Sequence, residues 1–175
     1  MLGLKHATGA DVVVTFTGGP ELEKAFKELT PSLQRRVIKK ATAAGAQVLV
    51  STAKRNLKAM LGKGSRLFSK DKHQRAGSLQ RSIKKRYWSR PERGLIAYMV
   101  GPSWPKGAHG HLVEHGHRIV IPTRDGKKVY TGRRTKPVPF MRRSLDEAGS
   151  AVQAAQVRKA KAEFEKIASK AAAKR

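Results

Sequence analysis

Residues 32–61 carry a helical pattern that is long for a chain of 175 residues. Apolar and small side chains recur every three to four positions, which places them on one face of a helix: Leu33, Val37, Ala41, Ala44, Val48, Thr52 and Leu57. Thr30 and Pro31 suit its start, and Gly62 suits its end. The pattern predicts a helix roughly 45 Å long. Its small residues at 41–46 would let a sheet or a neighbouring subunit approach closely.

The segments on either side of this helix predict a strand, a short helix and a loop. Val12–Phe16 is β-branched and aromatic, and a Gly-Gly-Pro turn follows it. Glu21–Leu29 has apolar residues at helical spacing and acids in its first turn. Residues 62–77 are rich in Gly, Lys, Ser and Arg, which predicts a basic loop.

The second half of the chain predicts strands and one last helix. Ser78–Trp88 and Leu95–Val100 are expected to form a hairpin around a turn at residues 90–94. A further strand at residues 110–115 is expected to lead into a second hairpin, with Ile119–Ile121 and Lys128–Tyr130 flanking an Asp-Gly turn. The final helix is expected to begin at Pro139 and to fray over residues 171–175.

This order of elements predicts an α+β fold in which one antiparallel sheet packs against one long helix, with a C-terminal helix and basic loops. Length and hydrophobic content suit one domain with a modest core. We expect that domain to span residues 1–150. Residues 151–175 are expected to form a C-terminal helical extension with a basic, frayed end.

The charge of the chain is its most unusual bulk property. It has 38 Lys and Arg against 12 Asp and Glu, a formal charge of +26. Residues 54–93 hold 14 basic residues against Asp71 and Glu92, and residues 118–143 hold 9 against Asp125. Such an excess implies a polyanionic partner: nucleic acid, a membrane surface or an acidic protein ring.

Cysteine usage and hydropathy indicate the compartment. There is no cysteine, which excludes a disulfide framework and cysteine-ligated metal, and fits a reducing cytoplasm. The first residues lack the apolar core of a signal peptide, and no apolar run reaches the roughly 18 residues of a membrane span. We expect a soluble protein that is not secreted and that needs no cofactor.

Four histidines, His109, His111, His115 and His117, occupy alternate positions in one segment. In an extended strand they would share one face and could hold a metal such as zinc. No acid shares that face, however, since Glu114 would point to the other side. A partly exposed strand is the preferred interpretation, with pH sensitivity at a subunit contact as an alternative.

No arrangement of residues indicates catalysis. The acids are scattered, so they do not form the cluster that a metal-dependent nuclease requires. Gly62–Ser65 lacks the glycine spacing and the preceding strand of a phosphate-binding loop. We therefore expect a protein that is not an enzyme.

Nucleic-acid binding is the main alternative from the residues alone. Lys84, Lys85 and Arg86 precede Tyr87 and Trp88, which combines phosphate contacts with stacking surfaces. The two aromatic residues could equally belong to a hairpin core. No groove-reading motif is present, so contact with DNA would be non-specific.

Six motifs in order along the chain resemble the neck, or head–tail connector (tail-component, tail-completion), family of long-tailed bacteriophages. They are a strand and short helix at residues 12–29, the long helix, Gly77–Ile83, Met99-Val100-Gly101, Leu112–Gly116 and Pro139-Phe140-Met141. Together they cover about residues 12–150. The loop at residues 63–76 and the insertion at residues 123–136 are more basic than this pattern requires, and the tail after Ser150 is extra to it.

The resemblance implies a structural virion protein, a subunit of a homo-oligomeric ring of six or twelve copies that joins the DNA-filled head to the tail. Its partners would be adjacent head-completion or connector proteins, tail proteins and packaged DNA, with no membrane. It would occupy the neck or tail end of the virion, and the host cytoplasm during assembly.

The resemblance also indicates which residues lie at an interface. Glu114, His115, Gly116, Pro139 and Phe140 are expected at a subunit or partner interface. Glu114 would pair with an arginine, either within the subunit or across a ring interface.

Contacts with DNA or an acidic partner are expected from five further residues, Lys84, Lys85, Arg86, Arg133 and Arg134. The alternative function is a non-specific DNA-binding or phage assembly protein that is absent from the finished particle.

Overall fold

The computed structural model describes residues 4–6, 12–14, 27, 29–61, 77–90 and 95–173. Its elements are β1 (Leu4–His6), β2 (Val12–Val14), α2 (Pro31–Leu61), α3 (Ser78–Ser82), β3 (Ile83–Arg90), β4 (Leu95–Pro102), α4 (Gly110–His115), β5 (Arg118–Pro122), β6 (Lys128–Arg134) and α5 (Phe140–Ala172). The short helix expected at residues 21–29, the loop at residues 63–76 and the turn at residues 91–94 lie largely or wholly outside the described residues.

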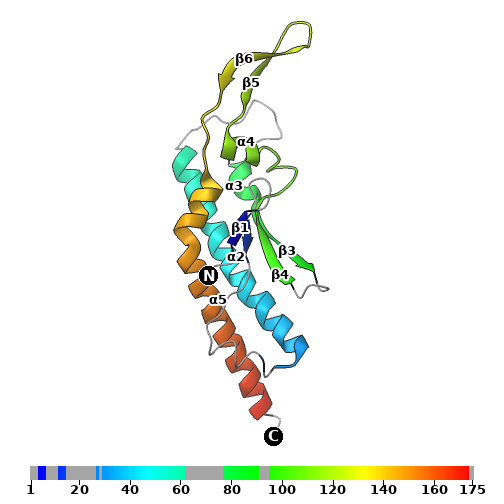
Figure 1. Ribbon diagram of the computed structural model, residues 1–175, viewed down its shortest axis with the longest axis vertical. Coiled ribbons are helices and arrows are strands. Elements are labelled where there is room, and N and C mark those ends of the chain that lie inside the picture. The colour runs from blue at the N-terminus through cyan, green and yellow to red at the C-terminus, as the bar shows by residue number, and fades with distance from the viewer. Residues whose placement is uncertain are drawn as a thin grey trace.

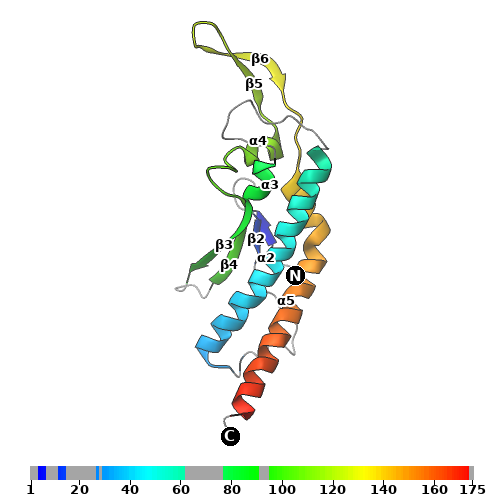
Figure 2. The same cartoon turned by 180° about the vertical axis from the view of Figure 1, so that it is seen from behind.

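The described elements form three layers with α2 in the middle. Helix α5 runs along one side of α2, and a four-stranded antiparallel sheet of order β1-β2-β4-β3 lies on the other (Figure 1). The view from behind shows the same order of layers (Figure 2). The predicted α+β fold, with a sheet against one long helix and a helix at the C-terminal end, is confirmed.

Helix α2 is long because its apolar residues keep a helical period over 31 residues and so find partners on both sides. Ala46, Leu49, Ala53 and Leu57 are fully or almost fully buried in the main core cluster. At Gly45 the two helices approach closely, since an added Cβ would lie 2.8 Å from Cγ of Gln156 on α5. The small residues in this part of α2 therefore allow α5 to pack closely against it.

The sheet confirms the first predicted hairpin and shows its register. Strands β3 and β4 pair antiparallel with Tyr87 opposite Tyr98, and β2 pairs with β4 through Val13 and Met99. Ring centroids of Tyr87 and Tyr98 lie 5.5 Å apart at an edge-to-face angle of 61°, facing α2. Strand β3 is an edge of this sheet.

Helix α5 continues without interruption through residue 150, to Ala172. Beyond that residue it still packs against α2: Val152, Ala155 and Ala160 are buried. A second, smaller core cluster joins Val37 and Ala41 of α2 to Ala160. Of the expected frayed end, residues 171 and 172 are helical.

Two segments predicted as strands are short helices instead. In α3 the buried residues are Ser78, Leu79 and Ser82, and in α4 they are Gly110, Val113 and Glu114. Burial at i, i+1 and i+4, or at i, i+3 and i+4, follows a helical period. The prediction of a strand over residues 78–82 and over residues 110–115 was therefore wrong, and β3 begins only at Ile83.

Candidate partner-binding surfaces

Glu114 links α4 to the first turn of α5 through hydrogen bonds. Its side chain is buried, and its two carboxylate oxygens accept the backbone N–H groups of Met141, at 2.9 Å, and Arg142, at 3.0 Å. These N–H groups lie in the first turn of α5, where no helical carbonyl is available to them and the helix dipole favours an anion. The carboxylate that was expected to pair with an arginine thus binds a helix N-terminus.

The β5–β6 hairpin is tied to the body at its root by His117 and Thr135. The backbone N–H of Thr135 donates to the carbonyl of His117 at 2.8 Å, and the N–H of His117 donates to Oγ1 of Thr135 at 2.9 Å. Gly116, just before, has φ 68° and ψ 158°, a conformation that is almost confined to glycine. An added Cβ there would lie 2.5 Å from the carbonyl oxygen of Thr135.

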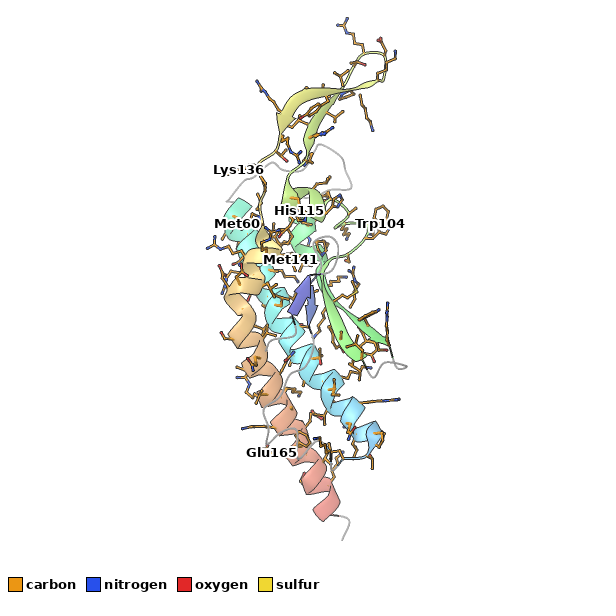
Figure 3. The ribbon with its side chains drawn as sticks, viewed as in Figure 1. Met60, Trp104, His115, Lys136, Met141 and Glu165 are labelled. Atoms are coloured by element: carbon orange, nitrogen blue, oxygen red, sulfur yellow. The ribbon has the colours of Figure 1, made fainter. Side chains whose placement is uncertain are left out.

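The five residues expected at an interface thus differ in exposure. Phe140 is fully buried in the core of this chain, and Glu114 is buried as the cap of α5. Gly116 and Pro139 are partly buried, and His115 is exposed. Figure 3 shows His115 near the root of the hairpin, where α4 meets the first turn of α5. Glu114 and Phe140 position this region, while His115 is available for contact.

The β5–β6 hairpin projects beyond the rest of the molecule at one end (Figure 1). Its exposed side chains include large apolar ones: Val120 is 46% exposed, Ile121 55%, Val129 52% and Tyr130 44%. Val120 pairs with Tyr130, and Ile121 with Val129. Because successive pairs of a strand face opposite sides, both faces of the hairpin expose apolar surface.

The same hairpin is strongly basic. Residues 118–136 hold seven Lys and Arg against one acid, Asp125. The predicted contact residues Arg133 and Arg134 are exposed on β6. Arg118 lies over the ring of Tyr130, 5.2 Å from its centroid. The exposed apolar side chains of the hairpin therefore lie among basic residues.

Strand β3 divides its basic residues between two faces. Lys85 points to α2, where its Nζ donates to the carbonyl of Ala43 at 3.0 Å. Lys84 and Arg86 are exposed on the opposite face with Arg90, whose guanidinium lies 4.9 Å from the ring centroid of Trp88. Side chains alternate along a strand, so two of the three predicted cations face away from the helix layers.

The four histidines do not share a face, because residues 110–115 are helical. Within the residues that the structure describes, no group of three or more His, Asp or Glu side chains could hold a metal ion. His109 is partly buried, and this burial, with His111 nearby, lowers the pKa of its imidazole. The predicted extended strand, which would have aligned the four histidines on one face, is therefore wrong.

Nothing in the residues around Trp104 singles it out as a surface residue. Its side chain is 81% exposed in the segment between β4 and α4, and Figure 3 shows it pointing away from the body. The exposed apolar residues of the hairpin were also missed as a surface, since apolar strand residues ordinarily indicate a core. The apolar residues of β5 and β6 are exposed because these two strands form a separate two-stranded ribbon.

Comparison with known proteins gives the family of the chain. A family model described as "Bacteriophage HK97-gp10, putative tail-component" matches residues 20–116, more than half of the 175 residues. The chain belongs to this family. HK97-gp10-like proteins are structural components of the phage tail, so this protein is a virion component and not an enzyme. The resemblance read from the sequence is confirmed at this level.

The matched region ends at Gly116, so β5, β6 and α5 lie beyond it. No significant match to a curated protein or to a solved structure was found. Among the described helices of this HK97-gp10-like chain, none is both long and apolar enough to cross a membrane.

Proposed function

We propose that this phage tail component is a subunit of an oligomeric ring in the neck, where it joins the DNA-filled head to the tail. The observation that carries the proposal, beside the family, is the exposed apolar and basic hairpin on a body with a complete core of its own. A subunit that has its own hydrophobic core and still exposes apolar side chains on both faces of a projecting ribbon is suited to assembly.

The ring would contain six or twelve copies joined by heterologous contacts, in which two different surfaces of the subunit meet. The exposed His115 and the adjoining hairpin root provide one such surface. Glu114, Gly116, Pro139 and Phe140 contribute to it by fixing where α4, the hairpin and α5 meet. Adjacent connector and tail proteins would bind above and below the ring.

The outward cations of β3 support contact with an anionic neighbour, either packaged DNA or an acidic protein. Lys84 and Arg86 lie on β3, an edge strand of the described sheet, where charged side chains also protect against unwanted strand pairing. Lys85 is held by α2, so its contribution to such a contact is smaller. Arg133 and Arg134 add charge at the hairpin.

An amber mutation in the gene tests the proposed function. Infection of a non-suppressing host should yield filled heads and complete tails that remain separate, and expression of the chain from a plasmid should restore joining. Electron microscopy of gradient fractions measures the joined fraction. Normal numbers of joined, infectious particles without the chain would contradict a role in the neck.

A second candidate function, favoured by the outward cations of β3, is non-specific binding of DNA by a protein that is absent from the finished particle. This protein would bind duplex DNA as a monomer or dimer, and its affinity would fall steeply with salt. Lys84→Gln combined with Arg86→Gln would then reduce the salt slope, whereas Lys161→Gln combined with Lys166→Gln on α5 would change it less. A salt-independent, weak interaction would exclude this candidate.

A further inference from the structure

The β5–β6 hairpin has no covering layer within the described molecule. The sheet and α5 both pack on α2, whereas the described strands β5 and β6 pair only with each other. An isolated two-stranded ribbon is at best marginally stable in water. Here its four large apolar side chains, each about half exposed, face water on both sides.

The root of the hairpin, in contrast, is firmly held. Thr135 and His117 exchange backbone and side-chain hydrogen bonds, including one of 3.0 Å between Oγ1 of Thr135 and Nδ1 of His117. The N–H of Val138 donates to the carbonyl of Val113 in α4 at 2.8 Å. The capping of α5 by Glu114 fixes the same junction. The base of the hairpin is therefore fixed to the body, whereas its distal part is not covered by any other described element.

The chemistry of the ribbon favours a protein over DNA as the group that covers it. Val120, Ile121 and Val129 have no donor for a phosphate oxygen, and burying them is favourable only against apolar surface. The one aromatic ring of the hairpin, Tyr130, already has a guanidinium over one of its two faces, so a base could stack only on the other. DNA would leave the aliphatic side chains in water.

Charge favours a different protein over a second copy of this chain. Seven cations against one acid surround the ribbon, and the chain as a whole carries +26. On the described body, Glu147 is paired with Arg55 and Arg143, and Glu163 with Lys40 and Lys159. Glu114 is buried in its cap, which leaves Asp146 and Glu165 as the remaining exposed acids of α5. Two such acids do not match the seven cations of the hairpin, so docking between copies would place cations mainly against cations.

We infer that the β5–β6 hairpin inserts both of its faces into an apolar groove, bordered by carboxylates, on another virion protein. This inference rests on the proposed function, since it supplies the chemistry of one partner of the neck subunit. The apolar side chains provide the buried contact. The surrounding Lys and Arg pair with the acids at the rim and select the partner.

Site-specific photo-cross-linking tests the inference. A benzophenone amino acid replaces Ile121 on one face of the hairpin, Tyr130 on the other, or Gln153 on the exposed surface of α5 as a control. Infected cells and gradient-purified particles are irradiated separately, and adducts are identified by peptide mass spectrometry. Both hairpin positions should cross-link to one segment of another phage protein, a segment rich in Asp and Glu, well above the level at Gln153.

The outcomes separate this inference from the proposed function. Adducts to DNA, adducts to a second copy of the chain, or yields no higher than at Gln153 overturn the docking of the hairpin even if the chain is abundant in particles. Adducts to an acidic phage protein in infected cells support it even if the chain is absent from particles, a result that would instead overturn the neck assignment.

Three double variants give an independent readout. Ile121→Ser with Val129→Ser should reduce the joined fraction of particles by about tenfold or more, because both side chains would lose their apolar burial in the partner's groove. Both side chains are exposed in the free chain, so its melting temperature should be unchanged. Lys127→Glu with Lys128→Glu should also reduce joining, whereas Lys161→Glu with Lys166→Glu on α5, with the same charge change, should not. Equal joining by all variants overturns the inference.

Discussion

Glu114 joins parts of the chain that are far apart in sequence, since its carboxylate binds backbone N–H groups 27 and 28 residues away. Replacing it with alanine leaves two N–H groups of the α5 N-terminus without their acceptor. We expect Glu114→Ala to lower the free energy of unfolding by about 2 kcal/mol, measured by urea denaturation. The exposed Glu165 is the control, and Glu165→Ala should change stability by less than about 0.5 kcal/mol. Equal effects would mean that the cap contributes nothing.

Gly116 and Gly126 both have positive φ, but only one is crowded. A Cβ at Gly116 would collide with the carbonyl of Thr135, whereas a Cβ at Gly126 would meet nothing within 4 Å. We therefore expect Gly116→Ala to cost several kcal/mol, and Gly126→Ala only about 1 kcal/mol for its left-handed backbone. Thermal denaturation followed by circular dichroism measures both. If Gly126→Ala is the worse variant, the root of the hairpin is not the crowded junction described above.

At the scale of elements, the approach of α2 to α5 depends on Gly45. Alanine is favoured over glycine in a helix by about 1 kcal/mol, but at residue 45 its Cβ would press on Gln156 and Val152. Overpacking of this kind costs about 1–3 kcal/mol, so Gly45→Ala should destabilise. Gly149 lies on α5 with nothing within 4 Å, so Gly149→Ala should stabilise by up to about 1 kcal/mol. The same sign for both changes in chemical denaturation would contradict the close approach.

The far ends of these two helices are joined by Glu163. Its Oε2 lies 2.6 Å from Nζ of Lys40, and this hydrogen bond, assisted by Lys159, lowers the pKa of the carboxyl. A lowered pKa in the folded state contributes stability above the ordinary glutamate range, and the contribution is lost as the pH falls through the folded value. Glu163→Gln should cost about 1 kcal/mol at neutral pH, and the difference from wild type should shrink in acid. A gap independent of pH would exclude this origin.

The elements differ in how far sequence alone could predict them. Helices α2 and α5 and strands β3 and β4 are long enough for their periods to be read, and the structure confirms them. Helices α3 and α4 have five and six residues, and over such lengths a helical and an alternating pattern are hard to distinguish.

The candidate surfaces were predictable only in part. Lys84 and Arg86 could be placed on one face from alternation along β3. The role of Glu114 could not, because its partners are backbone groups of a helix that begins 26 residues later. The exposure of Ile121 and Val129 arises because no third strand among the described residues pairs with the hairpin, which local sequence does not encode.

At the scale of the whole molecule, the long axis follows α2 and α5, with the hairpin at one end and the C-terminal end of α5 at the other (Figure 2). The described body has a hydrophobic core, and four of the large exposed apolar side chains lie on the hairpin, with Trp104 and Tyr87 elsewhere. A subunit of this shape can contact ring neighbours along its sides and a different protein at its tip.

The number of copies of the chain in the finished particle tests the neck assignment most directly. Quantitative mass spectrometry of gradient-purified particles, scaled against the major capsid protein, gives this number. A subunit of the proposed ring should be present at six or twelve copies per particle. Absence from the particle, or a copy number that matches neither ring, would contradict the assignment and favour an assembly or DNA-binding protein.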